Sequence, residues 1–405
     1  MILHHKDFDH LLIPQELNDH IIGFLLHDRE SLKTCSLVCR SWLKAAYPYL
    51  FRTLVIDQKL FQFSAPDSFL SFPSSCFHAM NYVREAKLSI SSTLLQTILM
   101  SRSCCLAWPP TLTRLHLYQC HFDRFSQLCD LIGTFPHLER LALERVEWDS
   151  EQNDTGMQVR DWSPSSLICL ELKETRMSRF LGWLSSSSER HITTHLELLG
   201  PIREEDVPAI CRYLIQTSSS LRYVAVSFEK QELANGSNWH LPILNHALVF
   251  PGLQPPKTSE IAKLYDRHFG LPRYPTPSII NALETLRIEG FIDCSDSISG
   301  ERDYARSQAA FWATRILSKI ESPHLFRRMV LQLVLGRAGD LDMCDVRWDF
   351  FDEAMGGSIF SNFEYLEFEI VGRKLQLDAV VSLLSLRLPR LAVGGRLRFS
   401  LKYNR

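Results

Sequence analysis

A short apolar pattern recurs along most of the chain. Each copy reads apolar-x-x-apolar-x-apolar and usually follows Ser or Pro. Side chains alternate between the two faces of an extended chain, so this spacing predicts a strand with one buried face. Clear copies are Leu112, Leu115, Leu117; Leu138, Leu141, Leu143; Leu167, Leu170, Leu172; Leu221, Val224, Val226; and Leu283, Leu286, Ile288. Weaker copies begin at Val83, Thr193, Phe326 and Phe363.

The first copies are evenly spaced. They begin at residues 83, 112, 138, 167, 193 and 221, in steps of 29, 26, 29, 26 and 28 residues, a period typical of leucine-rich repeats. Helical spacing follows in the intervening segments, at Phe122, Phe125, Leu128, Cys129 and Ile132, and at Val207, Ile210, Cys211, Leu214 and Ile215. We therefore predict an α/β fold that stacks into an irregular solenoid over residues 53–405. Because most copies lack the consensus asparagine, a non-repetitive α/β domain is the alternative.

The later copies are farther apart, with steps of 62, 43 and 37 residues, which predicts insertions at about 230–282, 290–324 and 334–362. Helices are expected within them at residues 260–268, 302–320 and 345–355. Insertions in a solenoid map to loops on one face, which is often the binding face. The first insertion is rich in proline and is a candidate for substrate contact, although most loop residues only connect.

Residues 11–52 have a different pattern, that of three short helices. We predict the first to open at Pro14, the second to span about 29–36, and the third to run from Leu37 to about Tyr47. The first helix has two apolar faces: Ile13, Leu17, Ile21 and Leu25 form one, and Ile22, Phe24 and Leu26 form the other. A unit of ~40 residues can hide only one such face, so the other predicts an interaction surface.

The same residues carry a family resemblance. Leu12-x-Pro14-x-Glu16-Leu17, followed by Ile21, Leu25 and Leu32 and then by Cys35-Ser36-Leu37-Val38-Cys39-Arg40-x-Trp42, resembles an F-box. The continuation through Leu50-Phe51-Arg52 is similar to F-box proteins of basidiomycete fungi. This resemblance implies three helices that dock on a Skp-type adaptor, and through it on cullin and RING subunits, while the repeats recruit a protein for ubiquitination. An ordinary helical cap with an accidental match is the alternative.

The resemblance implies adaptor contacts along residues 11–52, and we expect residues 1–10 to be flexible. Pro14 sets the entry angle of the first helix, and apolar side chains beside it are of the kind that dominate interfaces. Trp42 is equally compatible with the core of this unit. The expected adaptor-binding residues are Leu12, Pro14, Leu17, Ile21, Leu25, Leu37, Val38, Cys39 and Trp42.

A substrate-binding face is expected on the strands, between the buried apolar positions. These side chains mix charges of both signs, so a phosphorylated substrate is not specifically indicated. For any one of them, an ordinary solvated strand position is the alternative. The expected substrate-binding residues are Arg114, His116, Tyr118, Arg140, Glu144 and Lys173.

Composition narrows the function further. The 405 residues are 45% hydrophobic and 22% charged, with a net charge of -2, so no overall field favours nucleic acid or an anionic membrane. Neither an apolar leader nor a run of about 18 apolar residues is present, and the 11 cysteines show no zinc-type CxxC pairs. We expect a cytoplasmic or nuclear protein with reduced cysteines, without metal or membrane contact.

Motifs of catalysis are missing from the sequence. It contains no G-x-x-x-x-G-K-[ST] loop, no G-x-S-x-G elbow and no HExxH. We expect no catalytic residue and no cofactor. The resulting hypothesis is a non-catalytic substrate receptor of an SCF-type ubiquitin ligase with an unknown protein target. A non-degradative repeat scaffold and a hydrolase or transferase on an α/β sheet are the alternatives.

Overall fold

The computed structural model describes residues 13–57, 79–90, 111–150, 166–186, 192–200, 202, 206–227, 281–294, 308–318, 320, 322–343, 346–372 and 377–402. The chain divides into two compact units. The first comprises residues 1–140 with 147–159, and the second comprises residues 141–146 with 160–405. Leu12 and residues 230–280, with the helix expected at 260–268, lie outside the described residues.

Three short helices begin the first unit: α1 (Gln15–Gly23), α2 (Arg29–Ser36) and α3 (Arg40–Leu50). Asp28 caps α2, because its carboxylate accepts a hydrogen bond from the Ser31 amide at 3.0 Å. The predicted bounds of α2 are confirmed. The predicted start of α3 at Leu37 is wrong, since Cys39 is fully extended at φ -162 and separates the two helices. Leu37 and Val38 therefore lie in a turn.

The first unit continues into parallel strands, β1 (Thr53–Asp57), β2 (Glu85–Ser89) and β3 (Arg114–Tyr118). Their apolar positions are in register, and Leu88 pairs with both Ile56 and Leu117. A second sheet pairs β4 (His121–Arg124) with β6 (Glu147–Ser150), and α7 (Phe125–Gly133) follows β4. The sequence pattern assigned Phe122 to a helix, which is wrong, because it lies in β4.

The second unit contains the remaining strands, in the order β5-β7-β8-β9-β10-β11-β12-β13, except that Arg140, the first residue of β5, belongs to the first unit. Neighbours are parallel from β7 onwards. The strands are β5 (Arg140–Glu144), β7 (Cys169–Lys173), β8 (His195–Leu199), β9 (Tyr223–Ser227), β10 (Thr285–Asp293), β11 (Arg328–Val334), β12 (Tyr365–Val371) and β13 (Leu397–Lys402). Each predicted apolar pair is buried, as at Leu170 and Leu172, so the strands predicted from the apolar pattern are confirmed.

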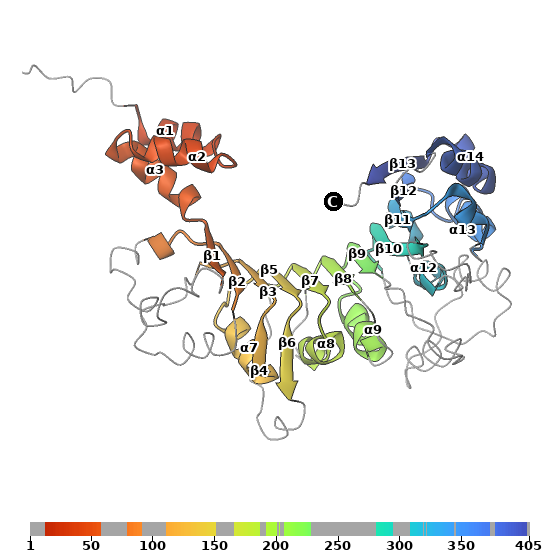
Figure 1. Cartoon of the computed structure of the whole chain (residues 1–405), viewed down its shortest axis with the longest axis horizontal. Helices are drawn as coiled ribbons and strands as arrows, with labels where there is room; N and C mark the ends of the chain where they lie inside the picture. Colours follow the sequence, from red (N-terminus) through yellow and green to blue (C-terminus); the bar gives the residue numbers. More distant parts are fainter. Residues whose placement is uncertain are drawn as a thin grey trace, which may run out of the picture. The chain divides into compact units, whose positions relative to one another are not determined.

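Helices connect these strands, as the predicted α/β class requires. Figure 1 shows α8 (Met177–Ser186) and α9 (Val207–Gln216) side by side along β7, β8 and β9. The helix expected at 302–320 is α12 (Gln308–Ser318), and the one expected at 345–355 is α13 (Trp348–Gly356). The remaining helical segments are η3 (Pro323–Leu325), η4 (Ala338–Met343), α14 (Leu377–Arg387) and α15 (Pro389–Val393). Among the described helices, none is long and apolar enough to cross a bilayer.

A backbone feature repeats with the sequence period. The residue after β3, β5, β7 and β8 has a positive φ in each case: Gln119 at 51°, Arg145 at 53°, Glu174 at 49° and Gly200 at 140°. These residues are spaced by 26, 29 and 26 positions, as are the corresponding copies of the apolar pattern. The period therefore describes a recurring local structure as well as a recurring composition.

Candidate interaction surfaces

The three N-terminal helices bury one apolar face and expose another. Ile22, Leu32, Ala45 and Ala46 form the buried core of this part. Eight large apolar side chains of the same helices and turns are exposed, with Leu17 at 52% and Leu37 at 86%. Leu26 and Phe51 are the least exposed of the eight. We call the other six the N-terminal apolar set: Ile13, Leu17, Ile21, Phe24, Leu37 and Val38.

The expected adaptor-binding residues divide between these two environments. Leu17, Ile21, Leu37 and Val38 belong to the N-terminal apolar set, and Pro14 and Cys39 are also exposed. Leu25 and Trp42 are partly buried and pack against the core. Trp42 therefore contributes to the core of this unit, which was the alternative to an adaptor contact.

Ile22 faces inward, and Leu17 and Ile21 face outward, so the first helix does bury one side and expose another. The predicted grouping is wrong for the residues at and after its end. Leu25, predicted with Leu17, packs against the core, whereas Phe24 and Leu26, predicted with Ile22, are exposed.

Polar contacts between α1 and α3 hold this arrangement. Asn18 is only 2% exposed, and its amide Nδ2 donates to Ser41 Oγ at 2.8 Å. The Ser41 hydroxyl in turn donates to Gln15 Oε1 at 2.8 Å. A buried amide is costly unless it is hydrogen-bonded, so this chain of contacts fixes the helix pair. Sequence analysis missed it, although an Asn on the inner face of an amphipathic helix was a signal.

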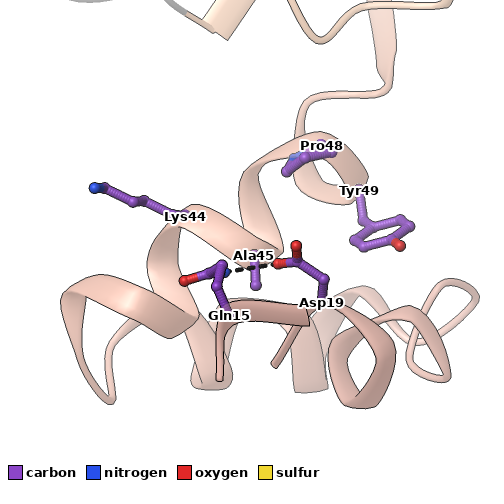
Figure 2. Close-up of a pocket in the computed structure, with 6 residues that line it drawn as sticks. All are labelled: Gln15, Asp19, Lys44, Ala45, Pro48 and Tyr49. Atoms are coloured by element: carbon purple, nitrogen blue, oxygen red, sulfur yellow. Dashed lines mark hydrogen bonds between the residues drawn. The ribbon is translucent and has the colours of Figure 1, made fainter. Parts of the chain in front are cut away.

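An open depression lies between the same two helices. It has a volume of about 440 Å³ and is lined by Gln15, Asp19, Lys44, Ala45, Pro48 and Tyr49. Figure 2 shows Gln15 bonded to Asp19, at 2.7 Å, while Lys44 extends away from both. The polar groups do not converge on one point, so the depression offers no nucleophile with an adjacent base.

A polar strand face is the second candidate, in the second unit. Its best-defined feature is Arg287 on β10, which makes a bidentate contact to Glu369 on β12, at 2.8 and 2.5 Å. Arg287 also donates to Glu289, at 3.1 Å, and Lys402 lies 2.8 Å from Glu369. Burial favours the neutral form of Glu369, but the bonds from Arg287 and Lys402 outweigh it and lower its pKa.

Two carboxylates face each other elsewhere on this surface. Glu171 on β7 and Glu197 on β8 are register partners on the same face of the sheet. Burial, followed by the charges of Glu171 and Glu289, raises the pKa of Glu197. The neighbouring Tyr223 stacks on His195 with ring centroids 5.6 Å apart, and burial raises the pKa of Tyr223 to about 12.

The expected substrate-binding residues occupy both units. Arg114, His116 and Tyr118 lie on β3 of the first unit and are half-buried, with the His116 and Tyr118 rings 6.4 Å apart. Arg140 is exposed at the start of β5. In the second unit, Lys173 and Glu144 come together.

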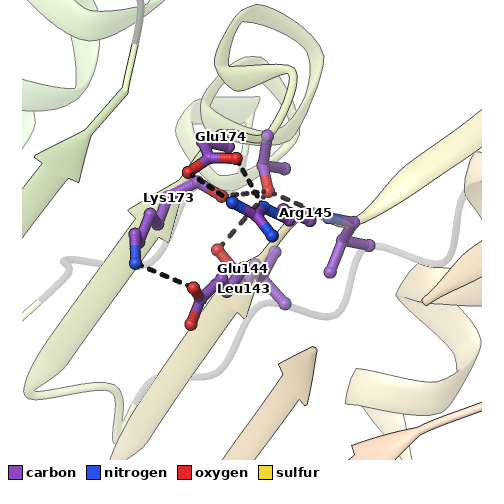
Figure 3. Close-up of polar contacts among 7 residues, drawn as sticks. Leu143, Glu144, Arg145, Lys173 and Glu174 are labelled. Carbon is purple, nitrogen blue, oxygen red and sulfur yellow. Dashed lines mark hydrogen bonds and ion pairs between the residues drawn. The ribbon is translucent and has the colours of Figure 1, made fainter. Parts of the chain in front are cut away.

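Figure 3 shows this second group and a contact that sequence analysis missed. Lys173 Nζ lies 2.8 Å from Glu144, whose hydrogen bond raises the Lys173 pKa. Beside them, Arg145 donates to Glu174 at 2.6 Å and lowers the pKa of Glu174. Three cations of the second unit, Lys173, Arg145 and Arg287, are thus engaged by carboxylates. A phosphate group would have to compete with those carboxylates, which agrees with the mixed charge seen in the sequence.

Two kinds of potentially reactive group occur among the described residues, cysteine thiols and a cluster of potential metal ligands. The described cysteines are thiols rather than disulfides, and burial raises the pKa of Cys120. His121, Asp123 and Asp149 are the described residues whose ligand atoms come close enough to hold a metal ion. The sequence carried a signal for this group, because His121-Phe122-Asp123 and Glu147-Trp148-Asp149 occupy the same place, 26 residues apart, after two successive copies of the pattern.

No family model matches the chain, and no curated protein is significantly similar to it. The structure is that of an α/β protein with a mostly parallel sheet, preceded by three short helices.

Proposed function

We propose that the chain is the substrate-recognition subunit of an SCF-type, cullin-RING ubiquitin ligase. In this proposal the three N-terminal helices are an F-box that binds a Skp-type adaptor. The strands and helices after residue 52 are an irregular leucine-rich-repeat solenoid that holds a target protein. The chain contributes no catalytic group, and the cytoplasm or the nucleus is where it would act.

The observation that carries the proposal is the exposure of the N-terminal apolar set on helices with F-box-like residues. Burying a leucine side chain completely stabilises by about 1.5–3 kcal/mol. Leu17 is half-exposed and Leu37 almost fully exposed, so covering them would contribute about 1 and 2 kcal/mol, respectively, by the same rule. A partner of matching apolar shape would gain this free energy, and the helical unit cannot gain it alone because its own core is already closed.

The repeating backbone supports the second half of the proposal. Positive φ values recur after successive strands. A carbonyl group that accepts two hydrogen bonds recurs just before successive strands. The carbonyls of Ile168, Thr194 and Arg222 each accept two consecutive amide groups from the next strand. Such nearest-neighbour pairing is what a stacked repeat produces. The exposed strand face would then be the surface that positions a target protein near the ubiquitin donor, which raises their effective concentration.

Co-purification tests the proposal. The full chain is co-expressed with a Skp-type adaptor, a cullin and a RING subunit and isolated through a tag on the chain. We expect the wild type to retain all three proteins, and Leu17→Asp and Leu37→Asp to lose them, because each would place a desolvated charge in the interface. The matched control is Leu386→Asp, which changes an equally apolar, 78% exposed residue on α14.

The outcomes separate the competing functions. Adaptor retained by both Asp variants, with circular dichroism unchanged, would refute the F-box assignment. Adaptor bound without cullin would support the non-degradative scaffold. Loss of adaptor from the Leu386→Asp control as well would show that the effect is not specific to the N-terminal helices.

A further inference from the structure

The small β4–β6 sheet places three potential metal ligands on one face. His121 pairs with Glu147, Phe122 with Trp148, and Arg124 with Ser150, so Asp123 lies opposite Asp149. Side chains alternate along a strand. Phe122 and Trp148 are accordingly buried on one face, and His121, Asp123 and Asp149 lie on the other, half-buried or exposed.

The ligand atoms of these three residues converge. One from each side chain lies within 4.8 Å of the others, and His121 Nε2 is 2.8 Å from Asp149 Oδ1. Like charges directly opposite each other on neighbouring strands are destabilising, which applies to Asp123 and Asp149. A divalent cation among them would offset that repulsion.

We propose that His121, Asp123 and Asp149 bind one divalent cation of the borderline class, with Zn²⁺ as its representative. An imidazole nitrogen with two carboxylate oxygens suits such an ion, whereas Mg²⁺ and Ca²⁺ prefer oxygen ligands alone. Ligand atoms about 2 Å from one ion lie at most about 4 Å apart. Small rotations of the partly exposed side chains close the remaining distance, and water completes the coordination.

The backbone beneath the ligands is held in place. Gln127 Oε1 accepts hydrogen bonds from the amides of Asp123 and Arg124, at 3.0 and 3.3 Å, which fixes the end of β4 against α7. Trp148 packs on Phe125 with ring centroids 5.1 Å apart, which anchors β6 from the buried side. Rigid elements keep a site pre-organised. A bound ion would link β4 to β6 and stabilise the folded first unit by mass action.

Zinc binding to the metal-stripped full chain tests this site independently of any adaptor. Equilibrium dialysis measures the number of Zn²⁺ ions bound per chain, for the wild type, Asp123→Asn and Asp149→Asn. We expect each variant to lose one ion and to lose the rise in Tm that Zn²⁺ gives the wild type. His137→Ala, which removes an exposed histidine outside the group, is the control and should keep both.

The opposite results are equally definite. If both Asp variants bind as many ions as the wild type, and their Tm rises equally with Zn²⁺, the group is only an ion pair and the proposal is wrong. Mg²⁺ binding as tightly as Zn²⁺ would overturn the assigned class of ion. Circular dichroism without metal checks the fold of the variants, which we expect to be intact because the exchanged groups lie on the solvent side of the sheet.

Discussion

Glu369→Gln should destabilise the second unit, because Glu369 joins two cations across three strands. Its carboxylate accepts two bonds from Arg287 on β10 and lies 2.8 Å from Lys402 on β13. The side chains of Glu369 and Arg287 are only 9% and 17% exposed. Glutamine keeps the shape and removes the charge, so the half-buried guanidinium loses its main partner.

The magnitude follows from how much of this network survives. Removing one partner of a fully buried ion pair costs about 3–5 kcal/mol. Arg287 keeps its bond to Glu289, and Lys402, being about half-exposed, keeps its hydration. We therefore expect a loss of about 2 kcal/mol in the free energy of unfolding, between the surface and buried limits.

Urea unfolding at pH 7 provides the assay, with Glu367→Gln as the matched control on the same strand. Glu367 accepts a bond from Ser400 Oγ at 2.9 Å, and a glutamine oxygen can still accept it, so this change should cost less than about 1 kcal/mol. The pKa of Glu369 is lower in the folded protein than its ordinary value. Its stabilisation is therefore present above the unfolded pKa, and it is lost as the pH falls through the folded pKa. Equal urea midpoints for Glu369→Gln and the wild type at pH 7 would refute this reasoning.

Two further substitutions test the strand face and the repeat. Glu197→Gln should stabilise the protein slightly at neutral pH, by less than about 1 kcal/mol. The pKa of Glu197 is raised in the folded protein, so ionised Glu197 lowers the free energy of unfolding above that pKa. The stabilisation by glutamine should therefore disappear below the unfolded pKa. A variant less stable than the wild type at pH 7 would show that the charge of Glu197 is needed. Gly200→Ala should cost about 1–3 kcal/mol, because Gly200 has φ 140° and an added Cβ would lie 2.8 Å from the Glu174 amide nitrogen; an unchanged Tm would contradict the backbone geometry at this turn.

The strands could be predicted because their signal is local. Leu170 and Leu172 occupy alternate positions of one segment, and the same holds for each later copy. Each strand can therefore be recognised from its own segment, without knowledge of contacts to distant residues.

That the first helix would bury one apolar side and expose another was also predictable. The sequence did not show which side would be inside, and the pattern placed Leu25 and Phe24 on the wrong sides. Which side is buried depends on α3, because Ile22 packs in the core with Ala45 and Ala46 of that helix.

Contacts between distant segments could not be predicted in this way. Arg287 and Glu369 are 82 residues apart and meet across an intervening strand, and neither residue lies in a distinctive motif. The extended Cys39 and the strand at Phe122 also depended on tertiary packing, because both segments have apolar spacing that suits a helix. His121 and Asp149 required the pairing of β4 with β6, which alignment of successive repeats would have indicated.

Hydrogen exchange with and without a Skp-type adaptor tests the central claim most directly. If the N-terminal apolar set is the docking surface, adaptor should slow amide exchange in α1 and in the turn holding Leu37 and Val38. Exchange in β10, β11 and β12 should stay unchanged. Slower exchange confined to those strands, or identical exchange throughout with adaptor in excess, would contradict an F-box role for the N-terminal helices.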